Sequence, residues 1–152
     1  MVKFCEVLLF NKKFYLGVED QAVVWADWHQ PQGESNPHHP LLLQVQQELA
    51  EYQQGLRKKF SFKMKPEGSE FQKRVWKELT KIAWGKTESY FDIATRMKSP
   101  QSVRAVASAI GRNPIAIFIP CHRVIAKNGG LGGYSGGLPT KINLLKIEGH
   151  SF

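Results

Sequence analysis

Short runs of apolar residues open the chain and predict a small antiparallel sheet. Residues 3–9, 13–18 and 22–27 are rich in Val, Phe, Leu and Trp, and pairs of polar residues separate them. Runs of this length between turn-forming residues are typical of strands joined by hairpins. Residues 28–40 contain three prolines and no periodic apolar positions, so we expect a loop there.

Apolar residues at helical spacing follow this loop. Leu42, Val45, Leu49 and Tyr52 recur every three or four positions, which predicts an amphipathic helix over about 40–56. The stretch KMKPEG that follows at residues 63–68 breaks the pattern with Pro and Gly. We therefore expect two domains, residues 1–68 and residues 69–152.

The second part begins with a predicted helix. Ser69 is a candidate N-cap and Gly85 a stop signal, and between them one apolar face is formed by Phe71, Val75, Trp76, Leu79 and Ile82. Two shorter helices are predicted over about 90–97 and 101–111, with the turn KSPQ between them. Short helices joined by a tight turn are typical of a helix-turn-helix.

A Gly-rich segment at residues 129–137 predicts a wing-like loop after the helix-turn-helix. A last helix is expected over about 139–148, with Pro139 in its first turn. The expected fold is α+β: a small antiparallel sheet with one helix, followed by a mostly helical, winged helix-turn-helix domain.

The net charge of +8 lies entirely in the second part. Residues 69–152 contain 13 Lys and Arg against 5 Asp and Glu, whereas residues 1–68 contain 8 of each. A basic half favours a polyanionic partner, with nucleic acid as the leading candidate. A merely soluble basic surface fits the same charge.

Several classes of protein are disfavoured by composition. No apolar run approaches the roughly 20 residues of a membrane-spanning helix. The N-terminal apolar patch has no small-residue cleavage site, which argues against a secretory signal. The two cysteines, Cys5 and Cys121, form no paired motif and fit a reducing compartment. We therefore expect a cytoplasmic protein, or a nuclear one in a eukaryote, without a membrane partner.

The predicted second helix of the pair is rich in small residues. Ala105, Ala107, Ser108 and Ala109 follow Arg104, the only charged residue of that helix before Arg112. Small residues let a helix lie close to another surface, which is either a neighbouring helix or DNA. A helix-turn-helix in a basic half favours DNA.

Cys121 is a candidate nucleophile. A thiolate is the reactive form of cysteine, and a nearby imidazole can promote its formation. His122 is adjacent in sequence and needs a local bend or a bridging water to act as the base. Glu148 is a candidate for orienting the imidazole. From spacing alone, a buried and inert thiol fits equally well.

The residues around Cys121 resemble a known signature. Pro120-Cys121-His122-Arg123-Val124 is similar to the active-site motif of the O6-alkylguanine-DNA alkyltransferases, also called methylated-DNA–protein-cysteine methyltransferases. Further matches run in order through nearly all of residues 69–149. They are Phe71, Val75-Trp76, Gly85, Ser89-Tyr90, Ile93-Ala94, Arg104-Ala105-Val106, Asn113-Pro114, Gly132, Tyr134-Ser135-Gly136-Gly137, Leu144-Leu145 and Glu148-Gly149.

The resemblance implies a suicidal DNA-repair protein. Its substrate would be O6-alkylguanine in double-stranded DNA, flipped out of the base stack into a pocket. The alkyl group would pass irreversibly to Cys121. His122, acting through a water and held by Glu148, would take the thiol proton. Residues 1–68 resemble only in outline the family's variable N-terminal domain, which is ribonuclease-H-like.

The resemblance also implies substrate and DNA contacts. The substrate-binding set consists of Tyr90, Asn113, Val124, Tyr134, Ser135 and Lys141. Within it, the Tyr90 phenol would donate to guanine N3, the Val124 carbonyl would accept from the guanine amino group, and Asn113 would brace the segment leading to Cys121. The DNA-binding set consists of Ser102, Arg104, Ala105, Arg112 and Arg123. Arg104 would enter from the minor groove and fill the space left in the stack.

No cofactor or metal is expected. Some relatives hold zinc in the N-terminal part through two cysteines and two histidines, whereas this region offers a single cysteine, Cys5, with His29, His38 and His39. By resemblance the protein would be a monomer in solution that binds DNA cooperatively. Three alternatives stay open: a non-catalytic lesion sensor on the same fold, a transcription factor, and a Cys-His hydrolase. Glu88, just before Ser89-Tyr90, has no role in this scheme.

Overall fold

Two compact units make up the structure, a computed structural model that describes residues 1–151. The first unit contains residues 1–67 and 114–118, and the second contains residues 68–113 and 119 onward. Residues 114–118 fall in the first unit, whereas the sequence predicts them in the second part. The reason is backbone pairing: the Ala26 N–H donates to the Pro114 carbonyl, and the Ala116 N–H donates to the Ala26 carbonyl.

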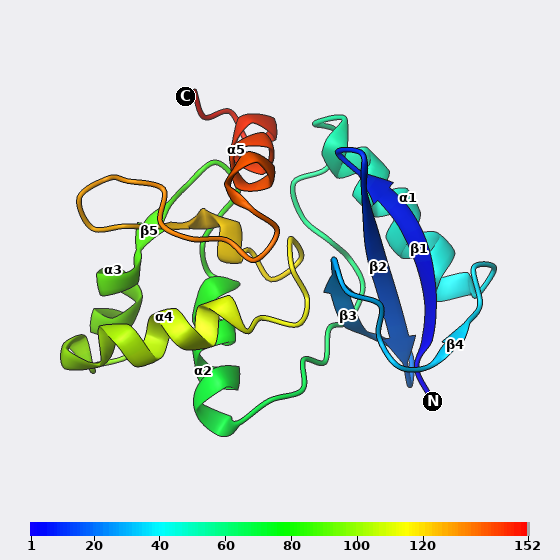
Figure 1. The fold of residues 1–152 in the computed structure, drawn as a ribbon, viewed down its shortest axis with the longest axis horizontal. Helices are drawn as coiled ribbons and strands as arrows, with labels where there is room; N and C mark the ends of the chain where they lie inside the picture. Colours follow the sequence, from blue (N-terminus) through cyan, green and yellow to red (C-terminus); the bar gives the residue numbers. More distant parts are fainter. Residues whose placement is uncertain (152) are drawn as a thin grey trace. The chain divides into compact units, whose positions relative to one another are not determined.

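The first unit is built on a four-stranded sheet in the order β3-β2-β1-β4 (Figure 1). Strands β1 (Lys3–Leu9), β2 (Lys12–Glu19) and β3 (Ala22–Asp27) form the expected antiparallel meander. Their two tight turns, at residues 10–11 and 20–21, have positive φ at both central positions, as two-residue hairpins require. Strand β4 (Glu34–Ser35) lies in the predicted loop and pairs parallel with β1, so the sheet is mixed and not purely antiparallel.

Helix α1 (Pro40–Gln53) packs on one face of this sheet, across β1 and β2 (Figure 1). Its predicted apolar face is buried, and alternate residues of the strands are buried beneath it. The largest of these fully buried side chains are Leu9, Phe14, Leu16, Leu42 and Tyr52. Burial of such side chains contributes about 1.5–3 kcal/mol each and holds the unit together.

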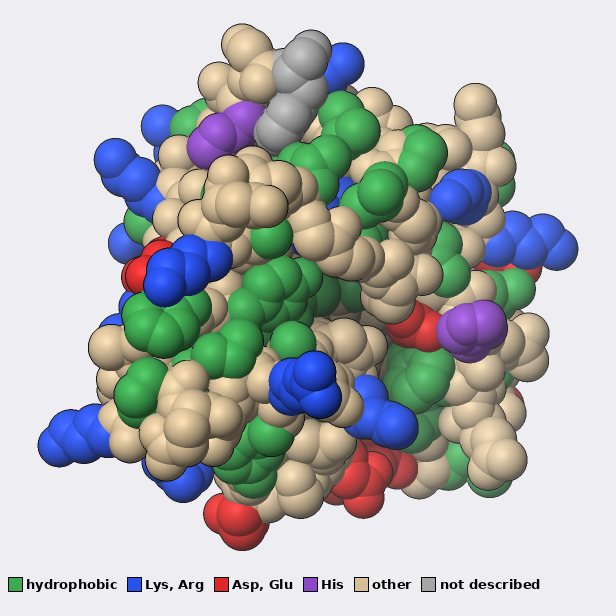
Figure 2. Space-filling view, turned by 60° about the vertical axis from the view of Figure 1, so that its left-hand side comes forward, with side chains coloured by type: hydrophobic (Ala, Val, Ile, Leu, Met, Phe, Trp, Pro, Cys, Tyr) green, Lys and Arg blue, Asp and Glu red, His purple; other side chains and the backbone are tan. Residues whose placement is uncertain are grey.

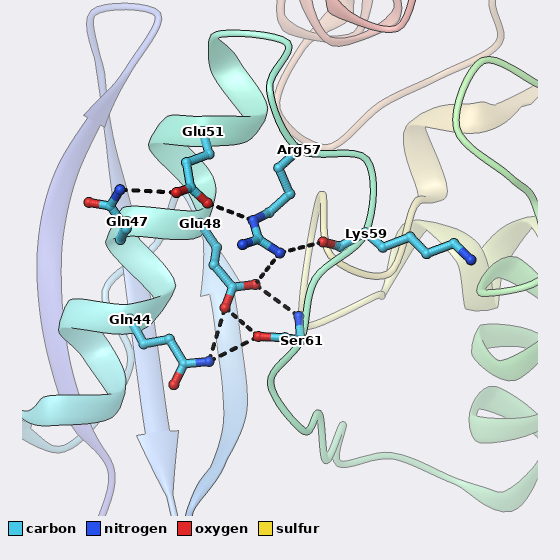
Figure 3. Close-up of polar contacts among 7 residues, drawn as sticks. All are labelled: Gln44, Gln47, Glu48, Glu51, Arg57, Lys59 and Ser61. Atoms are coloured by element: carbon cyan, nitrogen blue, oxygen red, sulfur yellow. Dashed lines mark hydrogen bonds and ion pairs between the residues drawn. The ribbon is translucent and has the colours of Figure 1, made fainter.

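A buried carboxylate ties the segment after α1 to that helix (Figure 3). Glu48 accepts hydrogen bonds from the Ser61 backbone N–H at 2.8 Å and from the Gln44 side chain at 2.9 Å, and Arg57 lies 3.4 Å away. Burial alone would raise the pKa of Glu48, but these donors lower it overall. The cluster therefore fixes the course of residues 57–61.

Helices dominate the second unit. Helix α2 (Glu70–Leu79) begins at the expected N-cap, where Ser69 and Gln72 form a capping box. Helix α3 (Tyr90–Arg96) is capped in the same way by Ser89 and Asp92. A short 3-10 helix, η1 (Pro100–Ser102), leads into helix α4 (Val103–Gly111), which completes the predicted helix-turn-helix.

The remaining elements of this unit surround Cys121. The 3-10 helix η2 (Cys121–Arg123) runs into β6 (Val124–Ile125), which pairs parallel with β5 (Glu88–Ser89). Helix α5 (Leu138–Ile147) follows the Gly-rich segment, which contains no strand within the described chain. The α+β class is confirmed. None of the helices in residues 1–151 is long and apolar enough to cross a membrane.

Candidate active site

Local backbone structure brings Cys121 beside the start of helix α3. The Asn113 side-chain amide donates to the Ile119 carbonyl at 2.8 Å, and the Cys121 N–H donates to the same carbonyl at 2.8 Å. These bonds fix the chain just before η2. The β5–β6 pair then holds the Ser89-Tyr90 segment next to the residues that follow Cys121. Asn113 thus has the bracing position expected of it and acts on the backbone.

His122 is buried against Glu148. Its ring is fully buried, and Nε2 lies 2.7 Å from Glu148 Oε2. Burial lowers the pKa of His122, although the Glu148 carboxylate acts against the shift. With Nε2–H donating to Glu148, Nδ1 is the basic nitrogen, and it has no hydrogen-bond partner in residues 1–151. Nδ1 is therefore the ring nitrogen that can accept a proton.

Arg123 is buried against Glu148, which corrects the DNA-binding role expected for it. Its Nε and Nη2 donate to the two carboxylate oxygens at 2.7 and 3.0 Å, and Nη1 donates to the Ile82 carbonyl at 2.7 Å. A guanidinium engaged on all three nitrogens and 7 % exposed cannot reach a phosphate. The resemblance implied a DNA contact for Arg123, whereas Glu148 binds both this residue and His122.

Glu148 remains ionised because of these partners. Burial alone would raise its pKa, but hydrogen bonds from His122 and Arg123 and the positive charge of Arg123 lower it to about 2. Arg123 in turn neutralises the carboxylate, so His122 faces a paired charge and not a bare one. This arrangement orients the ring without forcing it to hold a second proton.

Lys141 positions the Gly-rich segment. Its ammonium is fully buried and donates to the carbonyls of Val124, at 2.6 Å, Gly133, at 3.1 Å, and Leu131. Burial lowers the pKa of Lys141 to about 8. The lysine was expected among the substrate contacts, but it does not line the pocket described next. The Val124 carbonyl, expected to accept from guanine, has one of its two lone pairs engaged by this lysine.

A pocket of about 420 Å³ opens on Cys121. Its walls come from α3, α4, η2 and the Gly-rich segment, and its lining consists of Tyr90, Ala107, Ile110, Gly111, Cys121, Gly133, Tyr134 and Ser135. This volume falls in the range typical of small-molecule sites. Tyr90, Tyr134 and Ser135 therefore lie where the substrate contacts were expected.

The Tyr90 ring lies close against Gly132, a contact that the sequence did not predict. Gly132 has a φ of +70°, and a Cβ atom there would lie 2.8 Å from Tyr90 Oη. Burial raises the pKa of Tyr90, so its phenol keeps its proton and can donate it in a hydrogen bond. Positive φ combined with this close approach explains why glycine stands at position 132.

One face of helix α4 is exposed to solvent and carries mainly small side chains. Arg104, Ala105, Ser108, Gly111 and Arg112 are exposed, and Ser102 lies half-buried just before the helix. Val106, Ala109 and Ile110 on the other side are buried, and the Trp76 indole N–H donates to the Ala109 carbonyl at 2.8 Å. The remaining residues expected to contact DNA therefore lie at one end or along the open face of α4.

Glu88 has a structural partner. Its carboxylate pairs with Arg96, which also bonds Glu78 at 2.7 Å. The second cysteine, Cys5, is buried in the first unit, where burial raises its pKa to about 11. Among residues 1–151 no group of three or more His, Cys, Asp or Glu side chains is arranged to hold a metal ion.

Comparison with known proteins agrees with this geometry. Residues 70–150 match the family described as 6-O-methylguanine DNA methyltransferase, DNA binding domain. The constitutive methylated-DNA–protein-cysteine methyltransferase of Bacillus subtilis is 42 % identical over 142 residues, which cover 92 % of this chain and 84 % of that protein.

Solved structures give the same result. The O6-methylguanine methyltransferase of Mycobacterium tuberculosis superposes with a TM-score of 0.88 at 32 % identity, covering 97 % of this chain and 93 % of that one. The same organism's protein in complex with DNA superposes with a TM-score of 0.85 at 34 % identity, covering 97 % and 92 %. The chain therefore belongs to the methylated-DNA–protein-cysteine methyltransferases, the family of O6-methylguanine DNA methyltransferases that act in DNA repair.

Proposed function

We propose that this protein binds duplex DNA, draws an O6-alkylguanine out of the stack into the pocket over Cys121, and transfers the alkyl group to the Cys121 sulfur. The observation that carries the proposal is the combination of that thiol with a buried His122 held by Glu148 at 2.7 Å. Such a thiol–imidazole–carboxylate set is suited to nucleophilic chemistry.

The reaction is a displacement at the alkyl carbon. His122 Nδ1, through a bridging water, takes the proton of the Cys121 thiol. The thiolate attacks the alkyl carbon, a C–S bond forms, and the C–O bond to guanine O6 breaks with its electron pair going to the base. The proton held by the imidazole returns to the departing guanine, so thiol and O6-alkylguanine become thioether and guanine.

Tyr90 and the Gly-rich segment assist the departing base. The protonated Tyr90 phenol donates to guanine N3 and stabilises the negative charge that develops on the ring. The Ser135 backbone N–H donates to O6. Lys141, by binding three carbonyls of β6 and the Gly-rich segment, keeps those donors in place without contacting the base.

Helix α4 is the DNA-reading element. Its exposed face of small residues approaches the minor groove closely, and Arg104 fills the place of the extruded nucleotide. Ala105, Ser102 and Arg112 flank that position. Extrusion of the nucleotide costs a few kcal/mol of stacking and pairing, and contacts made by Arg104 and by the pocket offset this cost.

We propose that one monomer acts on each lesion and that monomers bind cooperatively. Because the proposed substrate is chromosomal DNA, we expect the protein to act in the cytoplasm, or in the nucleus of a eukaryote.

The product is a dead end because thiol exchange does not cleave a thioether. Cys5 belongs to the other unit and its raised pKa disfavours the thiolate, so it supplies no resolving nucleophile. Each molecule thus accepts one alkyl group, and no cofactor enters the reaction.

A titration tests the proposal. The protein is incubated with a tenfold excess of duplex that carries one radiolabelled O6-methylguanine, and label transferred to protein is counted after completion. We expect one methyl group per molecule, unchanged in a Cys5→Ser control. Several methyl groups per molecule or continuing release of guanine would contradict a single-turnover reaction. Lesion binding without transfer would instead identify a lesion sensor.

A further inference from the structure

A second hollow in the same unit is lined almost entirely by charged side chains. It has a volume of about 340 Å³ and lies between helix α2 and the end of α3. Its lining consists of Arg74, Lys77, Glu78, Lys81, Arg96, Met97 and Lys98. We call it the basic groove. It shares no residue with the pocket over Cys121, and no step of the proposed reaction uses it.

Glu78, which lines the basic groove, and Glu88 beside it are already paired with cations of the groove. Glu78 binds Arg96 at 2.7 Å and Lys81 at 3.0 Å, and Glu88 binds the same Arg96. These pairs leave an excess of positive charge, because two carboxylates face five cations.

Three of the five cations have no partner. Arg74, Lys77 and Lys98 are exposed, and none of them makes an ion pair or hydrogen bond through its side chain within residues 1–151. Three unpaired cations around one hollow repel each other, and an anion from outside would relieve that repulsion. Figure 2 shows Lys and Arg side chains projecting from this molecule at many points.

The α2 side of the basic groove faces away from the exposed face of α4. On α2, Val75, Trp76 and Leu79 are buried, whereas Arg74 and Lys77 are exposed on the opposite side, and Lys81 follows just after the helix.

Helix α4 shows the mirror arrangement. Its buried side, at Ala109, receives the Trp76 hydrogen bond from α2, and Arg104 and Ser108 lie on the open side. Two packed helices, each about 10 Å across, therefore separate the two exposed faces. A duplex lying against the exposed face of α4 would therefore leave Arg74 and Lys77 on the far side of α2.

We propose that the basic groove binds the phosphate backbone of a second segment of duplex DNA while α4 holds the segment that carries the lesion. This inference rests on the proposed function, which brings the protein to DNA. Phosphate contacts need positive charge and little else. An acidic peptide normally adds apolar anchors, and the only apolar residue lining the groove is Met97, which is buried.

The test measures bridging of two duplexes. A short duplex containing O6-methylguanine is immobilised and saturated with protein in the Cys121→Ser background, and a fluorescent lesion-free duplex is then added at increasing salt. The groove variant is Arg74→Gln/Lys77→Gln/Lys98→Gln. The control variant, Lys59→Gln/Lys63→Gln/Lys65→Gln, removes the same charge from exposed positions of the first unit. Urea unfolding checks that both variants fold.

We expect capture of the second duplex by the parent and the control variant, and a loss of about tenfold or more in the groove variant. Removing three phosphate contacts should reduce the slope of log affinity against log salt by about 2.7. Equal capture by all three proteins, or an equal loss in both triple variants, would overturn the proposal. Displacement of the second duplex by poly-glutamate of equal charge at lower concentration would overturn it in favour of an acidic protein partner.

A parallel assay separates this proposal from the proposed function. With Cys121 restored, the groove variant should transfer methyl groups from the short lesion duplex at the parent rate, because none of its three residues lines the Cys121 pocket. If the parent transfers methyl groups but does not bridge two duplexes, only the proposal of a second DNA site is overturned. Absence of transfer in the parent would remove the proposed function, whatever the bridging assay shows.

Discussion

The buried Glu148 carboxylate should make a large, pH-dependent contribution to stability. Its pKa falls from an ordinary 4.5 to about 2 in the folded protein, and a fall of this size corresponds to about 3 kcal/mol of unfolding free energy. A depressed carboxyl pKa stabilises the fold above the unfolded-state pKa. The contribution is therefore complete at about pH 5 and above, and about 2 kcal/mol of it is lost by pH 3.

Replacing Glu148 by Gln tests this reasoning. The variant keeps the side-chain volume but leaves Arg123 buried without its carboxylate, which costs about 3–5 kcal/mol near neutral pH. Urea unfolding followed by tryptophan fluorescence gives the free energy of each protein from pH 5 to pH 3.

The difference between parent and Glu148→Gln should shrink by about 2 kcal/mol over that range. A Glu67→Gln control, which removes an exposed carboxyl, should follow the parent. Parallel curves for the parent and Glu148→Gln would refute the assigned ionisation of Glu148.

Three other substitutions probe separate parts of the account. Arg104→Ala should slow repair of duplex DNA by on the order of a hundredfold yet leave reaction with free O6-methylguanine unchanged, because the side chain acts on the stack and not on the base; equal losses on both substrates would exclude the role in extrusion. Gly132→Ala would place Cβ 2.8 Å from Tyr90 Oη at a φ of +70°. We therefore expect alkyl transfer to slow about tenfold or more with both substrates. Unchanged kinetics would show that the reaction tolerates displacement of Tyr90. Lys98 has a φ of +61°, so Lys98→Gly should raise the urea unfolding free energy by about 1 kcal/mol; a decrease would mean that the lysine side chain offsets its backbone strain.

Periodic patterns predicted most of the regular elements. The meander at residues 3–27, helix α1 and the helix-turn-helix all follow from apolar spacing and capping residues. The two-residue strands β4, β5 and β6 were not predicted, because two residues are too few to show an alternating pattern of apolar and polar positions. Residues 114–118 are apolar, but nothing in their local pattern tells which sheet edge they will join, and they pair with Ala26.

The sequence predicted the candidate nucleophile and its two partners. It did not predict the contacts that support them. The Cys121 motif pointed to His122 and Glu148, and the structure joins those two at 2.7 Å. The resemblance to the family implied a DNA contact for Arg123 and a substrate contact for Lys141. Both are instead buried, where they bind a carboxylate and three carbonyls. Which charged residues become buried depends on partners distant in sequence, as Glu148 is from Arg123.

Transfer of the alkyl group to Cys121 is the central claim, and intact-protein mass measures it most directly. The protein is incubated with a duplex that contains one O6-methylguanine, beside a Cys121→Ser variant. The account predicts a gain of one methyl group, located by peptide mapping on the peptide that contains Cys121 and absent from the variant. A methyl group on any other residue, or an unchanged mass despite tight binding of the lesion, would contradict it.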